Sequence, residues 1–122
     1  MDERIINLAS KVDDKKIIQI NDYYFDQCII PNVKYICKIP VEYVNFWFME
    51  TNELFEEYNI IFKANYDCYL SLPDNVSWVN DEYPTIEENK IYELSIVKTK
   101  IDNMSYYKAI IAGFTPYDEM VG

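Results

Sequence analysis

The sequence contains no histidine, two glycines and one arginine, and each shortage excludes a class of function. Without histidine there is no Ser-His-Asp centre and no imidazole ligand for a metal. Gly113 and Gly122 are too few for a glycine-rich loop that cradles a phosphate. A protein that binds a nucleic-acid backbone requires clustered Lys and Arg, and Arg4 is the only arginine in this chain. We therefore assign no catalytic, cofactor-binding or metal-binding residues and expect neither an enzyme nor a nucleic-acid-binding protein.

Cysteines and long apolar runs are also scarce. Cys28, Cys37 and Cys68 are too few and too unevenly spaced for a disulfide or zinc framework. Each lies in an apolar, strand-like context, so we expect small-hydrophobe packing in a reducing cytoplasm. No apolar run approaches the length of a membrane span. The first fourteen residues, MDERIINLASKVDD, lack the basic-then-apolar order of a signal peptide, so neither secretion nor a membrane partner is expected.

The chain is acidic, with a formal net charge of −10 over 122 residues. Adjacent carboxylates occur as Glu56-Glu57, Asp81-Glu82, Glu87-Glu88 and Asp118-Glu119. All of these pairs fall in predicted turns or in the tail, where solvated charge explains them better than a glycosidase pair. We interpret the acidity as a source of solubility and of repulsion between copies. The alternative hypothesis is that the carboxylates mimic the charge of a nucleic acid.

Apolar residues recur with a period of two along most of the chain, and aromatic and β-branched residues are enriched, which predicts β-strands. The predicted strands are 15–20, 23–30, 33–39, 41–49, 58–64, 66–72, 90–99 and 104–114. Turn residues recur between them. This spacing predicts an all-β fold: an antiparallel β-sandwich or jelly roll of about eight strands over residues 15–117, followed by a short acidic tail at 118–122.

The first fourteen residues are the one segment with a helical period. Ile5, Leu8 and Val12 follow the helical spacing, and Asp2 is a candidate N-cap. Two interpretations of residues 1–14 stay open: a short helix that closes one end of the sandwich, and an arm that docks to a partner.

The segment VEYVNFWFME, residues 41–50, is apolar on both faces, whereas a half-buried strand should alternate. A second apolar face must be covered either within the chain or by another subunit. The candidate interface residues are Tyr43, Val44, Phe46, Trp47 and Phe48. The 12 tyrosines also suit an interface, because large amphipathic rings dominate both cores and interfaces.

The stretch LPDNVSWVNDEYPTIEENKIYELSIV, residues 72–97, carries a family resemblance. Its marked positions are Leu72, Pro73, Val76, Trp78, Pro84, Ile86, Tyr92, Glu93, Leu94, Ser95, Ile96 and Val97. This pattern resembles small virion domains of tailed phages, namely head-fibre, capsid-decoration and tail-fibre or baseplate modules. The similarity covers residues 58–114 well and 15–57 only in pattern. Family members usually have glycine in the turns where this chain has Asn80-Asp81-Glu82 and Glu87-Glu88-Asn89, although Asn tolerates left-handed backbone.

The resemblance implies a non-enzymatic virion structural protein, made in the host cytoplasm, whose partners are copies of itself, other virion proteins and a host-surface glycan. A trimer is favoured by analogy with such assemblies. Trp78, Pro84 and Ile86 are interpreted as anchors of the 73–90 loop, with Trp78 closing an end of the sandwich. The alternative functions are an acidic inhibitor of a host defence protein and, third, a carbohydrate-binding module.

Overall fold

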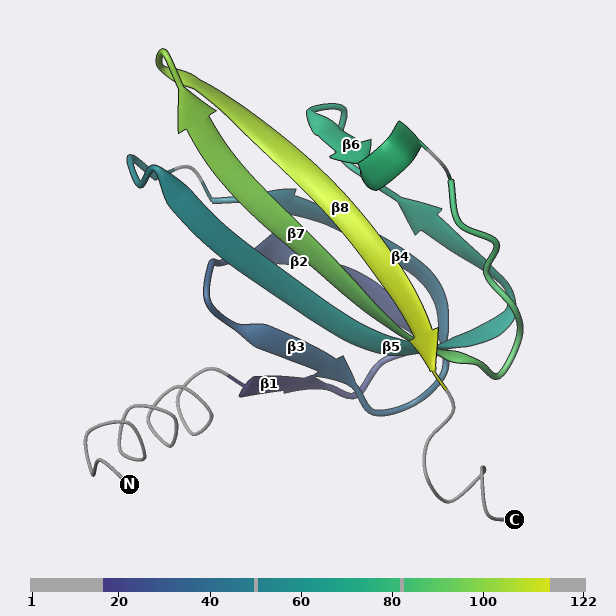
Figure 1. The fold of residues 1–122 in the computed structure, drawn as a ribbon. Helices are drawn as coiled ribbons and strands as arrows, with labels where there is room; N and C mark the ends of the chain where they lie inside the picture. The colour runs from purple at the N-terminus through teal and green to yellow at the C-terminus, as the bar shows by residue number, and fades with distance from the viewer. Residues whose placement is uncertain (1–16, 50, 82, 115–122) are drawn as a thin grey trace, which may run out of the picture.

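The computed structural model describes residues 17–49, 51–81 and 83–114, and most of this backbone is β-strand (Figure 1). The elements are β1 (Ile17–Ile20), β2 (Tyr24–Ile29), β3 (Lys34–Cys37), β4 (Val41–Phe48), β5 (Phe55–Ser71), β6 (Val76–Trp78), the 3-10 turn η1 (Val79–Asp81), β7 (Ile91–Ile101) and β8 (Met104–Phe114). The predicted all-β fold of about eight strands is confirmed. The predicted helix or arm at 1–14 and the tail at 118–122 lie outside the described residues.

The first five strands alternate between two sheets. Sheet A contains β1, β3, the first half of β5, β7, β8 and β6, in that order. Sheet B contains β2, β4 and the end of β5. The chain therefore forms three stacked arches, β1–β2, β3–β4 and the two halves of β5. In Figure 1 the strands β2 and β4 lie behind β3, β5 and β7.

Strand pairing is mixed, whereas the sequence predicted antiparallel strands. Among the described strands only the β5–β7 and β7–β8 pairs are antiparallel. The reason is that the connections at 21–23 and 38–40 cross from sheet A to sheet B instead of closing hairpins. Among β1 to β5, strands that neighbour each other within a sheet therefore come from successive arches and run in the same direction. The β7–β8 hairpin does have a two-residue turn, in which Asp102 and Asn103 take φ of 49° and 67°.

β5 replaces two predicted strands, 58–64 and 66–72, with one strand that serves both sheets. It pairs with β7 as far as Lys63 and with β4 from Ala64 onward. The register of the β4–β5 pair then shifts, which marks a bulge, and within it Asp67 adopts a left-handed φ of 54°. The predicted break was therefore at the right place, but the chain bends there without leaving the strand.

The core lies between the two sheets. Its fully buried members include Phe25, Tyr35, Val44, Tyr58, Ile60, Phe62, Leu94 and Ile96. From Glu56 to Ala64 on β5 and from Tyr92 to Lys98 on β7 every second residue is buried, as the period of two predicted. Aromatic rings pack edge-on or offset within this layer; Phe25 and Tyr35, for example, have centroids 5.5 Å apart at 84°.

Two charged residues share this interior. Lys98 is 1% exposed and Glu56 is 3% exposed. The Lys98 Nζ donates to Glu56 Oε1 at 3.0 Å, to Thr51 Oγ1 at 3.0 Å and to the Thr51 carbonyl at 3.1 Å. All three ammonium protons therefore have acceptors, which is the condition under which a buried charge is tolerated. Glu56 was expected in a solvated turn; it lies instead in β5, because the strand begins before the predicted boundary.

We expect the removal of one partner to be costly. Lys98→Met should lower the free energy of unfolding by about 3–5 kcal/mol, because Glu56 would remain buried and uncompensated. The double variant Lys98→Met/Glu56→Leu should be more stable than Lys98→Met alone. Urea unfolding measures both.

A matched control is the partly exposed pair of Lys34 and Glu93, whose Nζ and Oε2 atoms are 3.9 Å apart. Lys34→Met should cost no more than about 1 kcal/mol, because exposed ion pairs contribute little. A double variant that is less stable than Lys98→Met would contradict the desolvation argument.

Burial also keeps the thiols of Cys37 and Cys68 protonated to higher pH. Burial, aided by the neighbouring Cys68, raises the pKa of Cys37 to about 12, and burial raises the pKa of Cys68 to about 11. Burial likewise raises the pKa of Tyr58, with the nearby Glu56 carboxylate adding to the effect. Cys37 therefore behaves as a small apolar side chain, as the sequence indicated, since the thiolate is the reactive form of cysteine.

This predicts loss of stability in alkali. An unfolded chain releases the Cys37 proton from about pH 9, and the folded protein retains it to about pH 12. Within that window each pH unit of increase lowers the free energy of unfolding by about 1.4 kcal/mol through the Cys37 thiol alone. Cys37→Ala should therefore show a shallower decline of unfolding free energy above pH 9 than the wild type. Parallel declines in the two proteins would contradict the assignment.

Candidate functional site

β4 carries the predicted interface residues, and the structure divides them between its two faces. Val44 and Phe46 are buried in the core. Phe48 packs beside them, with its ring stacked on Tyr107 at 4.1 Å between centroids. These three residues are thus covered within the chain. Tyr43 and Trp47 point to the opposite face of sheet B, and Trp47 is 50% exposed.

The outer face of sheet B bears a row of tyrosines. Tyr24, Tyr43 and Tyr69 are register partners on β2, β4 and β5, so their side chains leave the same side of the sheet. The Tyr24 and Tyr43 rings stack with centroids 4.8 Å apart, which matches the distance between neighbouring strands. Tyr24 is 42% exposed and Tyr69 is 64% exposed. We call these three residues the tyrosine row.

Next to the tyrosine row runs a polar row of Asp26, Asn45 and Ser71, which are also register partners. The Asn45 amide donates to Asp26 Oδ1 at 2.9 Å. Trp47 follows on the far side of this row. At the other edge the Glu42 carboxylate raises the pKa of Tyr24, mainly through a side-chain hydrogen bond. The outer face of sheet B therefore alternates aromatic and polar rows.

The predicted loop anchors lie elsewhere, at the edge of sheet A. Trp78 is in β6, where it pairs with Ala109 of β8 and so faces the core side of the sheet. Because β6 is an edge strand, the indole is half-buried and not enclosed at the end of the sandwich, where it was predicted. Ile86 packs against the core and Pro84 is half-buried. The Trp78 ring meets Tyr83 edge-on at 5.9 Å.

The turns that depart from the family pattern adopt left-handed backbone. Asp81 has a φ of 56° and Asn89 a φ of 66°. Glycine is the usual residue at such positions, and Asn and Asp are the usual substitutes. The turn at 87–90 is further held by Tyr92, whose hydroxyl accepts the Glu87 backbone N–H at 2.7 Å.

A groove opens at the end of the sandwich where β4 finishes and the β7–β8 hairpin turns. Its volume is about 570 Å³. It is lined by Trp47, Phe48, Thr51, Asn52, Pro73, Asn75, Lys98, Lys100, Asn103, Ser105 and Tyr107. We call it the end groove. The buried Lys98 forms part of its floor, so the ion pair described above lies directly beneath it.

Sequence reasoning missed the end groove and its lysine, although a signal was present. In the predicted strand 90–99 the inward residues are Tyr92, Leu94 and Ile96, and the same period places Lys98 inward. A lysine on an apolar face implies a buried partner, and the inward pattern of β5 places Glu56 to meet it. The other lining residues come from separate loops, and no local pattern brings them together.

Other site classes receive no support from the part of the chain that the structure describes. No group of three or more Cys, Asp or Glu residues is placed there to hold a metal ion. No helix among the described residues is long and apolar enough to cross a bilayer. Comparison with protein-family models, curated proteins and solved structures gives no match for this chain. What the tyrosine row and the end groove do is therefore inferred from their own geometry.

Trp78 should contribute to stability as a half-buried edge residue. Trp78→Ala should lower the free energy of unfolding by about 1.5–3 kcal/mol, less than the roughly 3–5 kcal/mol of a fully buried aromatic. Tyr83→Phe keeps the neighbouring ring and removes only its hydroxyl bond to the Leu70 carbonyl, so it should cost about 1 kcal/mol. Urea titration gives both values. A loss below about 0.5 kcal/mol for Trp78→Ala would show that the indole anchors nothing.

Proposed function

We propose that the protein is a non-enzymatic structural protein of a bacteriophage virion, and that it assembles with copies of itself through the outer face of sheet B. The observation that carries the assembly is the tyrosine row, with Trp47 beyond it on the same face. Exposed aromatic side chains on a flat sheet offer large contact areas with few rotatable bonds, and such residues are enriched at interfaces.

The charge of this face favours a second copy as its occupant. The whole chain has a net charge of −10, so two copies repel each other over most of their surfaces. The exposed acidic residues on β2, β4 and the end of β5 in sheet B are Asp26, Glu42 and, at the bulge of β5, Asp67; Asp26 and Glu42 are each hydrogen-bonded to a neighbour. The aromatic centre of the face is uncharged. Two acidic copies can therefore approach here at a lower electrostatic cost than elsewhere.

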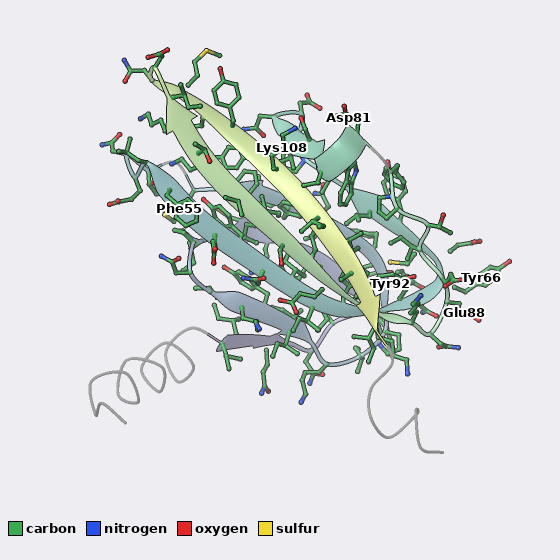
Figure 2. All side chains as sticks on the ribbon, viewed as in Figure 1. Phe55, Tyr66, Asp81, Glu88, Tyr92 and Lys108 are labelled. Carbon is green, nitrogen blue, oxygen red and sulfur yellow. The ribbon has the colours of Figure 1, made fainter. Side chains whose placement is uncertain are left out.

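The virion assignment is supported by the sequence pattern at 72–97 and its resemblance to tailed-phage virion domains. The described carboxylates also favour a structural role over mimicry of nucleic acid, which requires acids in spaced rows on one surface. Figure 2 shows Asp81 beside β6 and Glu88 at the separate end of the molecule where Tyr66 lies. The buried carboxylate, Glu56, is engaged by Lys98 and is not available for acid–base chemistry.

The assembly predicts an oligomer that a single substitution dissociates. Sedimentation velocity at micromolar concentration should show an oligomer for the wild type and a monomer for Tyr69→Glu, because the new carboxylate would be desolvated at the interface. Tyr106→Glu is the matched control, since Tyr106 is also exposed but lies on sheet A. Circular dichroism should be unchanged in both variants. A monomeric wild type, or equal dissociation by both variants, would refute the tyrosine row as the interface.

The same variants test the virion location. Mass spectrometry of purified particles of a phage that encodes this chain should detect it in many copies, and in fewer copies for Tyr69→Glu. Charge reversal at Glu87 and Glu88 should leave incorporation unchanged, whereas its loss would favour an electrostatic partner. Absence of the wild-type chain from the particles would refute the virion assignment.

A further inference from the structure

The end groove differs in charge from the rest of the molecule. Acidic residues outnumber basic ones by 21 to 11 in the chain, yet none of the described residues that line the groove is a carboxylate. Two lysines do, Lys98 and Lys100. The charge of Lys98 is balanced by Glu56 beneath it, whereas Lys100 has no side-chain partner among the described residues. Among its described lining residues the groove therefore presents one uncompensated positive charge and no negative one, which favours an anionic group on the ligand.

The rim of the groove is rich in amides. Asn52, Asn75 and Asn103 come from three different loops, and each carboxamide carries donors and an acceptor. No side-chain hydrogen bond occupies any of these three amides within residues 17–49, 51–81 and 83–114. Ser105 adds a hydroxyl. Groups that both donate and accept match the hydroxyls of a sugar, which do the same.

Aromatic rings complete the wall. Trp47, which is 50% exposed, lines the groove from the outer face of sheet B, and the Phe48 and Tyr107 rings, which stack nearly parallel at 6°, line it from the inner face. An exposed indole offers an apolar surface on which the C–H face of a sugar ring can lie while its hydroxyls reach polar groups. The volume of about 570 Å³ lies within the range of small-ligand sites.

We propose that the end groove binds a saccharide carrying one anionic group, either a carboxylate or a phosphate. Trp47 supports the sugar ring, the amides of Asn52 and Asn75 bond its hydroxyls, and Lys100 pairs with the anionic group. A role for this site in host attachment rests on the proposed virion function, whereas the binding itself does not.

Nuclear magnetic resonance titration of the 15N-labelled protein tests the site. The probes are glucuronic acid, glucose 6-phosphate, glucose and inorganic phosphate. The two acidic sugars should shift the indole N–H signal of Trp47 and the backbone signals of the lining residues. Glucose should bind about tenfold more weakly, because it lacks the group that Lys100 pairs with. Inorganic phosphate should bind about tenfold more weakly than glucose 6-phosphate, because it makes no ring contact.

Matched variants assign the contributions. Lys100→Gln should weaken both acidic sugars about tenfold and leave glucose unchanged, whereas Lys108→Gln, on the outer face of sheet A, should change neither. Asn75→Ala should weaken all three sugars. Asn103 is unsuitable for substitution because its left-handed backbone forms the β7–β8 turn.

Three outcomes would overturn the proposal: no shift at the lining residues, equal affinity for glucose and the acidic sugars, or phosphate binding as tightly as glucose 6-phosphate. The test is separate from the assembly, because Tyr69→Glu should bind the acidic sugars with wild-type affinity. Loss of binding in that variant would place the ligand on the tyrosine row and overturn the assignment to the end groove.

Discussion

One strand, β5, belongs to both sheets, and the position at which it changes partners governs the other strands. Up to Lys63 it is held by β3 and β7, and from Ala64 it is held by β4. A straight strand could not do this, because the two sheets lie in different layers. The bulge at 65–68 supplies the bend, and the β1–β2 and β3–β4 arches stack on the shape that β5 defines. The core, the tyrosine row and the end groove all follow from this arrangement.

A chain with two glycines makes these bends by other means. Within residues 17–49, 51–81 and 83–114 the non-glycine residues with left-handed φ are Asn32, Asp67, Asp81, Asn89, Asp102 and Asn103, all of them Asn or Asp. Their short polar side chains tolerate this conformation better than other residues do. Tyrosine hydroxyls then fix the loops: Tyr35 accepts the Ile30 N–H at 3.0 Å, and Tyr83 donates to the Leu70 carbonyl at 2.8 Å. Part of the high tyrosine content is therefore structural and indicates no interface.

The sequence could predict where strands run but not which strands pair. A period of two is a local property, so it located the inward residues Tyr58, Ile60 and Leu94. Parallel arches and antiparallel hairpins have the same local pattern, and only contacts between distant segments distinguish them. For the same reason the sequence showed that both faces of β4 are apolar, but it could not show what covers each face. Phe46 and Trp47 have different environments because sheet A covers the face of β4 that carries Phe46 and leaves the face that carries Trp47 exposed.

The tyrosine row and the end groove complement each other physically. A groove that is open to solvent and has, among its described lining, one lysine without a side-chain partner gains little from desolvation and should bind one sugar weakly. Trp47 stands on the same face as the tyrosine row, so copies that associate through that row would carry their end grooves as a fixed group. Linked sites of this kind raise the effective affinity for a repeating polymer by a factor of about 10²–10⁴ without any stronger single contact. Weak binding at each groove is therefore compatible with firm attachment to a surface polysaccharide, provided that the copies hold their grooves at a spacing which the polymer can span.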